Sequence, residues 1–219
     1  SVQSDSRVKR VALASVTGIL FSIISLFLSL LLRKAFITRI GVEYLGLYTF
    51  LAELFGLLTA VDGGVCSSLF IKIHKPIADK DENEVARIYK LIKIVYSIRS
   101  VLVIVIGCIL FFALSWLSSD VEISIKEIRI AYVIYLIINA SSYLFIYNQF
   151  ILEAYQKRYI SNIVTFGVTV VFTIINMVML ECFKSFYIYL SIQVSISLAV
   201  YIVCTFLVKK KYPALRQKA

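Results

Sequence analysis

The segment Tyr44–Ile73 most constrains the fold, because it stays largely apolar over a length that exceeds a lipid bilayer. As a single helix it would be about 45 Å long, against roughly 30 Å for the hydrocarbon core of a bilayer. It carries two acids, Glu53 and Asp62, and the pair Gly63-Gly64 follows directly. Because a glycine pair is one of the few identifiable causes of a helix kink, the sequence predicts one long, bent transmembrane helix over 44–73.

The composition places the whole chain in a membrane. Hydrophobic residues make up 60% of the 219 residues, charged residues only 16%, and there are two prolines. Soluble domains average about 25% charged residues and about 45–50% apolar residues. The net charge of +10 comes from short basic clusters between apolar runs, which is the pattern of membrane topology. We therefore expect membrane lipid as a partner and no nucleic acid.

The cysteines and the single histidine predict no cofactor. Cys66, Cys108, Cys182 and Cys204 stand singly within or beside apolar runs, without a C-x-x-C pair. Neither a disulfide framework nor a metal site follows from this spacing. His74 lies between Lys72 and Lys75 and is interpreted as a solvated residue at the membrane edge.

The fold class predicted is all-α: a polytopic membrane helix bundle of six transmembrane helices that forms one unit over 1–219. Each apolar run is long enough to span a bilayer. The expected helices are 11–32, 44–73, 94–117, 128–152, 160–180 and 186–208. Arg99 is left inside the third of them.

The polar segment before the third span predicts an amphipathic helix over about 82–93. Asp81 and Glu84 fit a capping box at its start, and apolar residues follow at helical spacing opposite Arg87, Lys90 and Lys93. We expect this helix to lie on the membrane surface and to run into 94–117. The span itself offers little that is polar between Val101 and Leu114, and is therefore expected to face lipid.

The distribution of basic residues predicts the orientation. With six spans both termini share one side, and that side carries Arg7, Lys9, Arg10, Lys72, Lys75, Lys80, Arg87, Lys90, Lys93, Lys157, Arg158, Lys209, Lys210, Lys211, Arg216 and Lys218. The opposite side carries only Arg33, Lys34, Arg39, Lys126, Arg129 and Lys184. By the positive-inside rule we expect a multi-pass protein of the cell (plasma) membrane with both termini in the cytoplasm.

Small and polar residues form one stripe on the first span. Gly18, Ser22, Ser25 and Ser29 recur every three or four residues, and Arg33 extends the stripe by another four. Two interpretations stay open: a surface for close helix packing, or the wall of a hydrated cavity. Arg33 itself either contacts a substrate phosphate or extends to the outer headgroups.

Two further stripes are too polar to face lipid. They comprise Tyr135, Asn139, Ser142, Gln149 and Glu153 on the span 128–152, and Thr165, Thr169, Thr173 and Asn176 on the span 160–180. We expect both to face protein or water inside the bundle.

The two acids of the second span do not form a catalytic pair. Glu53 and Asp62 are nine residues apart and thus fall on opposite faces of a straight helix. Since an acid at membrane depth is a functional-site hypothesis by default, both are candidates for ion coupling. No nucleophile elbow, H-E-x-x-H or P-loop occurs in the chain, so an enzyme is not expected and transport remains.

Several segments together resemble a known family. They are RIGVEYLGLY at 39–48, the acid and glycines at 62–64, IHKPIADKDENEV at 73–85, SYLFIYNQFILEAYQKRYISNIV at 142–164 and KKYPALRQK at 210–218. The chain is similar over its whole length to the N-terminal half of polysaccharide flippases, within the multidrug/oligosaccharidyl-lipid/polysaccharide exporter superfamily. It departs from their pattern at Gly63, where an apolar residue is usual, and at Glu53, which has no counterpart.

The resemblance implies an exporter that moves lipid-linked oligosaccharide or polysaccharide units to the outer leaflet by alternating access between two lobes. This chain would supply one lobe, with the C-terminal lobe of the same protein as a missing partner. The alternatives are a drug or metabolite exporter of the same superfamily and a non-transporting scaffold subunit. Candidate substrate-binding residues are Arg33, Arg39, Ser22, Ser25, Ser29, Asn139, Ser142, Gln149 and Asn176.

Thiol labelling tests the orientation. In a cysteine-free background, single cysteines at Asp120 and Lys184 should react with an impermeant thiol reagent in intact cells, and one at Asp79 should not. Labelling at Asp79 alone would invert the topology.

Overall fold

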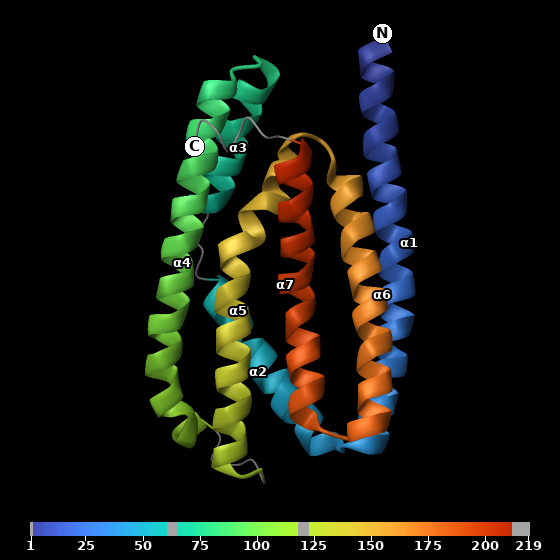
Figure 1. Ribbon diagram of the computed structural model, residues 1–219, viewed down its shortest axis with the longest axis vertical. Coiled ribbons are helices and arrows are strands. Elements are labelled where there is room, and N and C mark those ends of the chain that lie inside the picture. Colours follow the sequence, from blue (N-terminus) through green and yellow to red (C-terminus); the bar gives the residue numbers. More distant parts are fainter. Residues whose placement is uncertain (1, 61–64, 118–122, 212–219) are drawn as a thin grey trace.

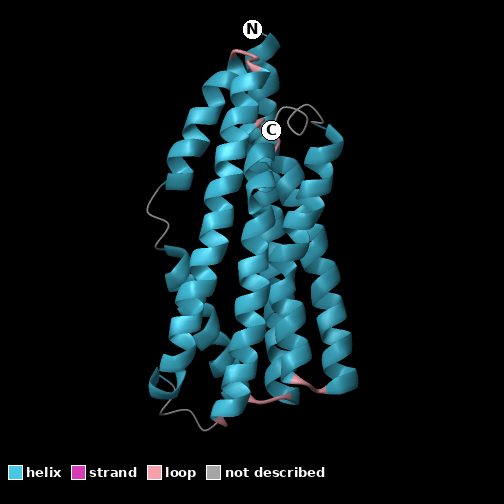
Figure 2. Cartoon of the chain, turned by 60° about the vertical axis from the view of Figure 1, so that its left-hand side comes forward, coloured by secondary structure: helices cyan, strands magenta, loops and turns pink. Residues whose placement is uncertain are grey.

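Helices account for the architecture of the chain. The computed structural model describes residues 2–60, 65–117 and 123–211, and these residues form seven helices and no strand (Figure 2). The helices are α1 (Val2–Arg39), α2 (Val42–Ala60), α3 (Val65–Ala78), α4 (Glu82–Leu117), α5 (Ile125–Ala154), α6 (Arg158–Phe183) and α7 (Phe186–Lys211). The predicted all-α class is confirmed.

Five described helices, α1, α4, α5, α6 and α7, are long and apolar enough to cross a membrane. The chain is therefore a multi-pass helical membrane protein. Its helices extend past the predicted spans: α1 continues to Arg39, where the sequence predicted a connection from residue 33, and α5 includes 128–152 with a few residues at either end. The helices extend beyond the apolar segments because the charged residues that flank these segments continue the same pattern of backbone hydrogen bonds.

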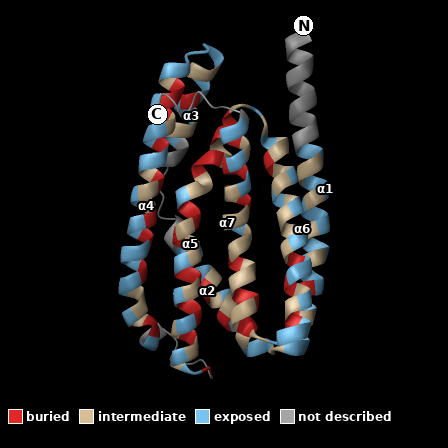
Figure 3. Cartoon of the chain, viewed as in Figure 1, coloured by how far each residue is buried: buried red, intermediate tan, exposed pale blue. Residues whose placement is uncertain are grey.

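The spans stand in a row whose order differs from the sequence order. Across the row the helices follow as α4, α5, α7, α6 and α1 (Figure 1). α7 is thus inserted between α5 and α6, while α1 packs along α6 at one edge and α4, with α3, forms the other edge. Buried residues concentrate on the inner sides of α5 and α7, and the edge helices expose long apolar faces (Figure 3).

The second predicted span corresponds to two helices. α2 ends at Ala60 and lies obliquely across the bundle, whereas α3 begins at Val65 and packs beside α4 (Figure 1). Neither is among the five helices that qualify as spans within the described residues, and the expected bend over 61–64 lies outside those residues, so a single bent span over 44–73 stays a prediction. Asp62 and the glycine pair lie outside the described residues.

Aromatic packing explains the oblique course of α2. Its Phe55 ring stacks on Tyr135 of α5 at 4.7 Å between centroids, and its Tyr48 ring meets Tyr189 of α7 edge-on at 5.9 Å. The Phe36 ring of α1 also packs on Tyr189, with 4.3 Å between the ring centroids. These rings bury α2 across helices that are distant in sequence, and they close the end of the bundle opposite the N-terminus.

A hydrogen bond fixes the start of α2. The Tyr44 hydroxyl donates to Oε2 of Glu127 on α5 at 2.7 Å. Ionising the phenol would break this bond beside a carboxylate, and the pKa of Tyr44 is raised to about 12. Gly41 precedes α2 with φ of +119°, a conformation that side chains rarely adopt, and so allows the sharp turn from α1.

α4 is one continuous helix of 36 residues, in which the predicted amphipathic segment 82–93 runs directly into the segment 94–117. Asp81 caps it, since its Oδ1 accepts from the backbone N–H groups of Asn83 and Glu84 at 3.1 Å. The Glu84 side chain pairs with Arg87 at 3.5 Å. The apolar face that suggested membrane contact is instead buried, with Val85 and Ile92 nearly inaccessible beside α3 and α5.

The opposite side of α4 agrees with the expectation of a lipid-facing helix. Its apolar side chains Val101, Leu102, Val105, Ile109 and Phe112 are exposed. On the inner side α4 approaches α5 closely, since the Tyr132 hydroxyl donates to the Gly107 carbonyl at 2.7 Å. A Cβ atom on Gly107 would overlap the Leu136 side chain.

Candidate functional site

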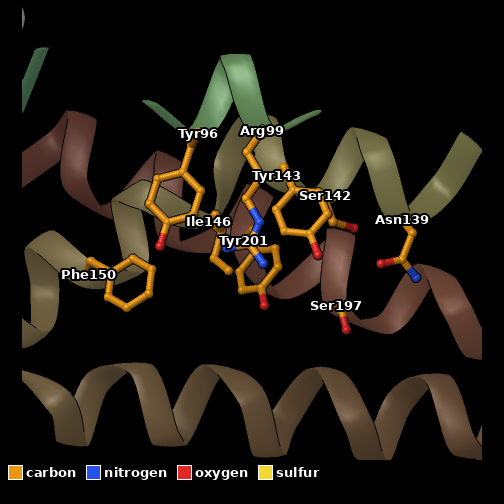
Figure 4. Close-up of a pocket in the computed structure, with 9 residues that line it drawn as sticks. All are labelled: Tyr96, Arg99, Asn139, Ser142, Tyr143, Ile146, Phe150, Ser197 and Tyr201. Carbon is orange, nitrogen blue, oxygen red and sulfur yellow. The ribbon is translucent and has the colours of Figure 1, made fainter. Parts of the chain in front are cut away.

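A cavity of about 280 Å³ lies between α4, α5 and α7 (Figure 4). Its walls combine one cation with aromatic, amide and hydroxyl groups, contributed by Tyr96, Arg99, Asn139, Ser142, Tyr143, Ile146, Phe150, Ser197 and Tyr201. Arg99 stands near the middle of α4, and Ser197 and Tyr201 stand in the middle part of α7. Arg99 is the sixth residue of the expected span 94–117, so the cavity lies within the spans but toward one end of them.

Helical spacing brings the lining residues together. Tyr96 and Arg99 are three residues apart on α4, and Ser197 and Tyr201 are four apart on α7, so each pair shares a face. On α5 the residues from Asn139 to Phe150 recur at intervals of one to four along one side. Each helix thus turns its polar stripe toward the other two and its apolar stripe outward.

Arg99 supplies the only charge among the lining residues. Its guanidinium carbon lies 4.6 Å from the centroid of the Tyr143 ring, in a cation–π geometry. Figure 4 shows its side chain extending between Tyr143 and Tyr201. None of the nine lining residues is acidic. A charge at membrane depth is costly and by default marks a functional site, so the cavity is suited to an anionic group.

The remaining walls are aromatic at one end and polar at the other. Tyr96 and Phe150 stack with their ring centroids 5.6 Å apart. Asn139 and Ser197 lie toward the opposite end of the cavity in Figure 4, and Ser197 is exposed. The cavity therefore opens beside Ser197. Its volume is just below the roughly 300–1,000 Å³ of pockets for drug-sized ligands.

Hydrogen bonds lock the three helices together on both sides of Arg99. The Ser100 hydroxyl donates to the Ala140 carbonyl of α5 at 2.8 Å and is buried. On the other side of Arg99, toward the start of α4, the Tyr89 hydroxyl donates to Oδ1 of Asn148 at 2.9 Å. Nδ2 of Asn148 in turn donates to Oγ1 of Thr205 at 2.9 Å, so α4, α5 and α7 meet at one buried amide.

Only some of the predicted site residues of α5 and α6 line the cavity. Asn139 and Ser142 line the cavity. Gln149 does not, and its amide lies 3.4 Å from Oε1 of Glu153 on the same helix. Asn176 is fully buried between α6 and α7, where its Nδ2 donates to Gln193 at 3.3 Å. At the other end of the α6 stripe Thr165 is exposed, so only part of that stripe faces protein.

The stripe on α1 lies away from the cavity, because α1 packs along α6. The hydroxyls of Ser22 and Ser29 donate to carbonyls of their own helix, those of Gly18 and Leu26. A Cβ atom on Gly18 would sit 3.2 Å from Nδ2 of Asn162 on α6. Close helix packing fits the contact at Gly18, whereas Ser22 and Ser29 are exposed, and neither Ser25 nor Arg33 lines the cavity.

The other charged candidates are also elsewhere. Arg39 forms an ion pair across the ends of α1 and α6, with NH2 2.7 Å from Oε2 of Glu181 and Nε 3.1 Å from Oε1. Both side chains are about half exposed, so the pair is a surface contact. Glu53 is exposed on α2, and Asp62 is outside the described residues. Ion coupling at either acid stays a prediction.

Sequence reasoning missed Arg99 and Asn148 as site residues. The signal for Arg99 was present, since it is one basic residue within an otherwise apolar run. The rule that marks acids at membrane depth as functional applies equally to an arginine. Asn148 gave no comparable signal, because its role depends on Tyr89 and Thr205 from helices distant in sequence.

Comparison of the chain with protein-family models, curated proteins and solved structures found no match. Within the described residues, His, Cys, Asp and Glu form no group of three or more that could hold a metal ion. The candidate site therefore rests on the geometry of the cavity.

Replacing Asn148 by Leu tests the three-helix junction. The change removes both interhelical bonds of the amide and should lower the free energy of unfolding by about 1–2 kcal/mol, since interhelical hydrogen bonds in membranes contribute about 0.6 and at most about 1.7 kcal/mol each. Unfolding of the purified chain in detergent measures this. Ser141→Ala is the matched control, because that hydroxyl bonds only the carbonyl of Ile137 on its own helix. Equal stability of the two variants would contradict the junction.

Proposed function

We propose that the chain is one lobe of a transporter that moves lipid-linked oligosaccharide or polysaccharide units across the plasma membrane. The observation that carries the proposal is the cavity at membrane depth, whose single charge is Arg99. A positive charge among aromatic and hydroxyl groups suits a substrate with a phosphate-bearing carrier and a sugar. The segments that resemble polysaccharide flippases point to the same substrate class.

The exposed apolar face of α1 is the second feature that supports a transporter with two lobes. α1 exposes much of its apolar surface, including Ile19, Ile23, Phe27 and Leu30, although it is long enough to span. A second lobe or lipid would cover this face. Alternating access moves one bundle against another around a site near the midplane, so we propose that the working transporter contains a second lobe. The basic clusters favour cytoplasmic termini.

Genetic complementation tests the proposed function. Deleting the complete gene in its own cell should remove surface polysaccharide and leave lipid-linked units on the cytoplasmic leaflet, and the complete gene should restore export. Residues 1–219 expressed alone should reach the membrane without restoring export, because a single lobe has no partner to move against.

Two outcomes would contradict the proposal. Unchanged surface polysaccharide in the deletion strain, together with increased sensitivity to toxic compounds, would favour the drug-exporter alternative. Full export by residues 1–219 alone would remove the requirement for a second lobe. Immunoblotting of membranes provides the control that the chain is inserted in each case.

A further inference from the structure

We propose that the hairpin formed by α3 and the start of α4 binds the headgroups of anionic phospholipids. The binding surface, called the basic surface below, consists of exposed cations on the two helices of the hairpin: Lys72, Lys75, Arg87, Lys90 and Lys93. None of these residues lines the cavity between α4, α5 and α7. The proposal therefore goes beyond the proposed transport function and does not depend on it.

The position of the basic surface along α4 is the first argument. The exposed side chains of this continuous helix change from basic at Arg87 and Lys90 to apolar at Ile94 and Ile98. Because residues three or four apart share one face of a helix, these four residues form one stripe. The apolar part of the stripe faces the acyl chains, so its basic part begins where the hydrocarbon core ends and the headgroups start.

α3 contributes the second part of the basic surface because it is amphipathic. On its inner side Ile73 is buried, and the Phe70 ring meets the Phe150 ring of α5 at 5.9 Å between centroids. On its outer side Lys72 and Lys75 are exposed. α3 is too short to span a bilayer and is therefore suited to the interface, where an amphipathic helix turns its basic side to the headgroups.

The hairpin brings the cations of both helices to similar heights. α3 packs beside α4 at the end of the bundle that carries the N-terminus (Figure 1). Counted from the turn at Lys80, Lys72 is eight residues earlier and Arg87 is seven residues later. At 1.5 Å per residue, both lie roughly 10–12 Å from the turn along the helix axes. Cations that are distant in sequence therefore face the same layer of the membrane.

The acids of the hairpin are separated from the basic surface. They are confined to the segment 79–84 around the turn and comprise Asp79, Asp81, Glu82 and Glu84. Asp81 caps α4, and Glu84 pairs with Arg87 at 3.5 Å. In the part of the chain that the structure describes, the four lysines of the basic surface form no ion pair. An anionic membrane attracts these lysines and repels the acidic turn, which holds the hairpin upright.

Exposed apolar side chains among the cations favour lipid over a soluble anion. Ile71 is 70% exposed beside Lys72, and Leu91 is 44% exposed beside Lys90. A phospholipid can contact such side chains with its acyl chains and the lysines with its phosphate, whereas a soluble anion uses only the charge. Clusters of about four to eight Lys and Arg residues next to a transmembrane helix are typical of binding to anionic lipids.

Quenching of tryptophan fluorescence by brominated lipids tests the proposal. The purified 219-residue chain is placed in bilayers of phosphatidylcholine with a minor fraction of phosphatidylglycerol, and equal fractions of either lipid carry bromine on their acyl chains. Trp116, the single tryptophan of the chain, is replaced by Phe. A new tryptophan is introduced by Ile94→Trp next to Lys93 or, as the matched control, by Phe112→Trp toward the other end of α4. Both positions are exposed, at 46% and 78%.

We expect brominated phosphatidylglycerol to quench the Ile94→Trp probe about twofold more than brominated phosphatidylcholine, because the basic surface enriches anionic lipid nearby. The Phe112→Trp probe should show a clearly smaller preference. Replacing the four lysines of the basic surface by Gln should make the two lipids quench the Ile94→Trp probe equally, whereas replacing all four by Arg should preserve the preference. Added salt should weaken it.

Several outcomes would overturn the proposal. They are equal quenching of the Ile94→Trp probe by the two lipids, a preference that survives the four Gln substitutions, and a preference that is equally strong at Phe112→Trp. Displacement of the lipid by soluble polyphosphate at matched ionic strength would replace the lipid with a soluble anion as the partner. Circular dichroism checks that each variant is folded. If the fourfold Gln variant is not, the pair Lys90→Gln and Lys93→Gln should still reduce the preference, and an unchanged preference would reject the basic surface.

Discussion

A guanidinium group inside a bilayer has to be accommodated by its protein surroundings, and the packing of α4 against α5 and α7 provides them. The apolar faces of these helices point outward, and their polar stripes meet around Arg99. Because lipid cannot satisfy buried polar groups, the same requirement also accounts for the junction at Asn148 and the bond from Ser100 to Ala140.

The rest of the bundle divides into a closed end and an open edge. α2 lies across the end opposite the N-terminus and is held there by rings such as Phe55 on Tyr135 and by the hydrogen bond from Tyr44 to Glu127. At the edge α1 packs along α6, near Gly18 and Asn162, and exposes apolar side chains that include Ile19, Ile23, Phe27 and Leu30. The proposed second lobe would meet the chain at such a face.

The sequence predicted the helical class and the positions of most spans, because long apolar runs and the Asp81 cap depend on local residues. The order of the helices in space was not predictable, since α7 enters between α5 and α6 through contacts distant in sequence. Of the candidate residues, Asn139 and Ser142 line the cavity, whereas the α1 stripe that includes Ser25 does not. The oblique course of α2 depends on ring packing against α5 and α7, which are distant in sequence.

Cysteine cross-linking tests most directly whether α4, α5 and α7 enclose the cavity and α1 stays outside it. In a cysteine-free background, the pair Ser142→Cys and Ser197→Cys should be joined by a short bifunctional thiol reagent, because both residues line the cavity. The pair Ser142→Cys and Ser25→Cys should not be joined, because α1 packs on α6. Mass spectrometry of the digested chain detects each product. Cross-linking of Ser142 to Ser25 but not to Ser197 would contradict this arrangement of the bundle.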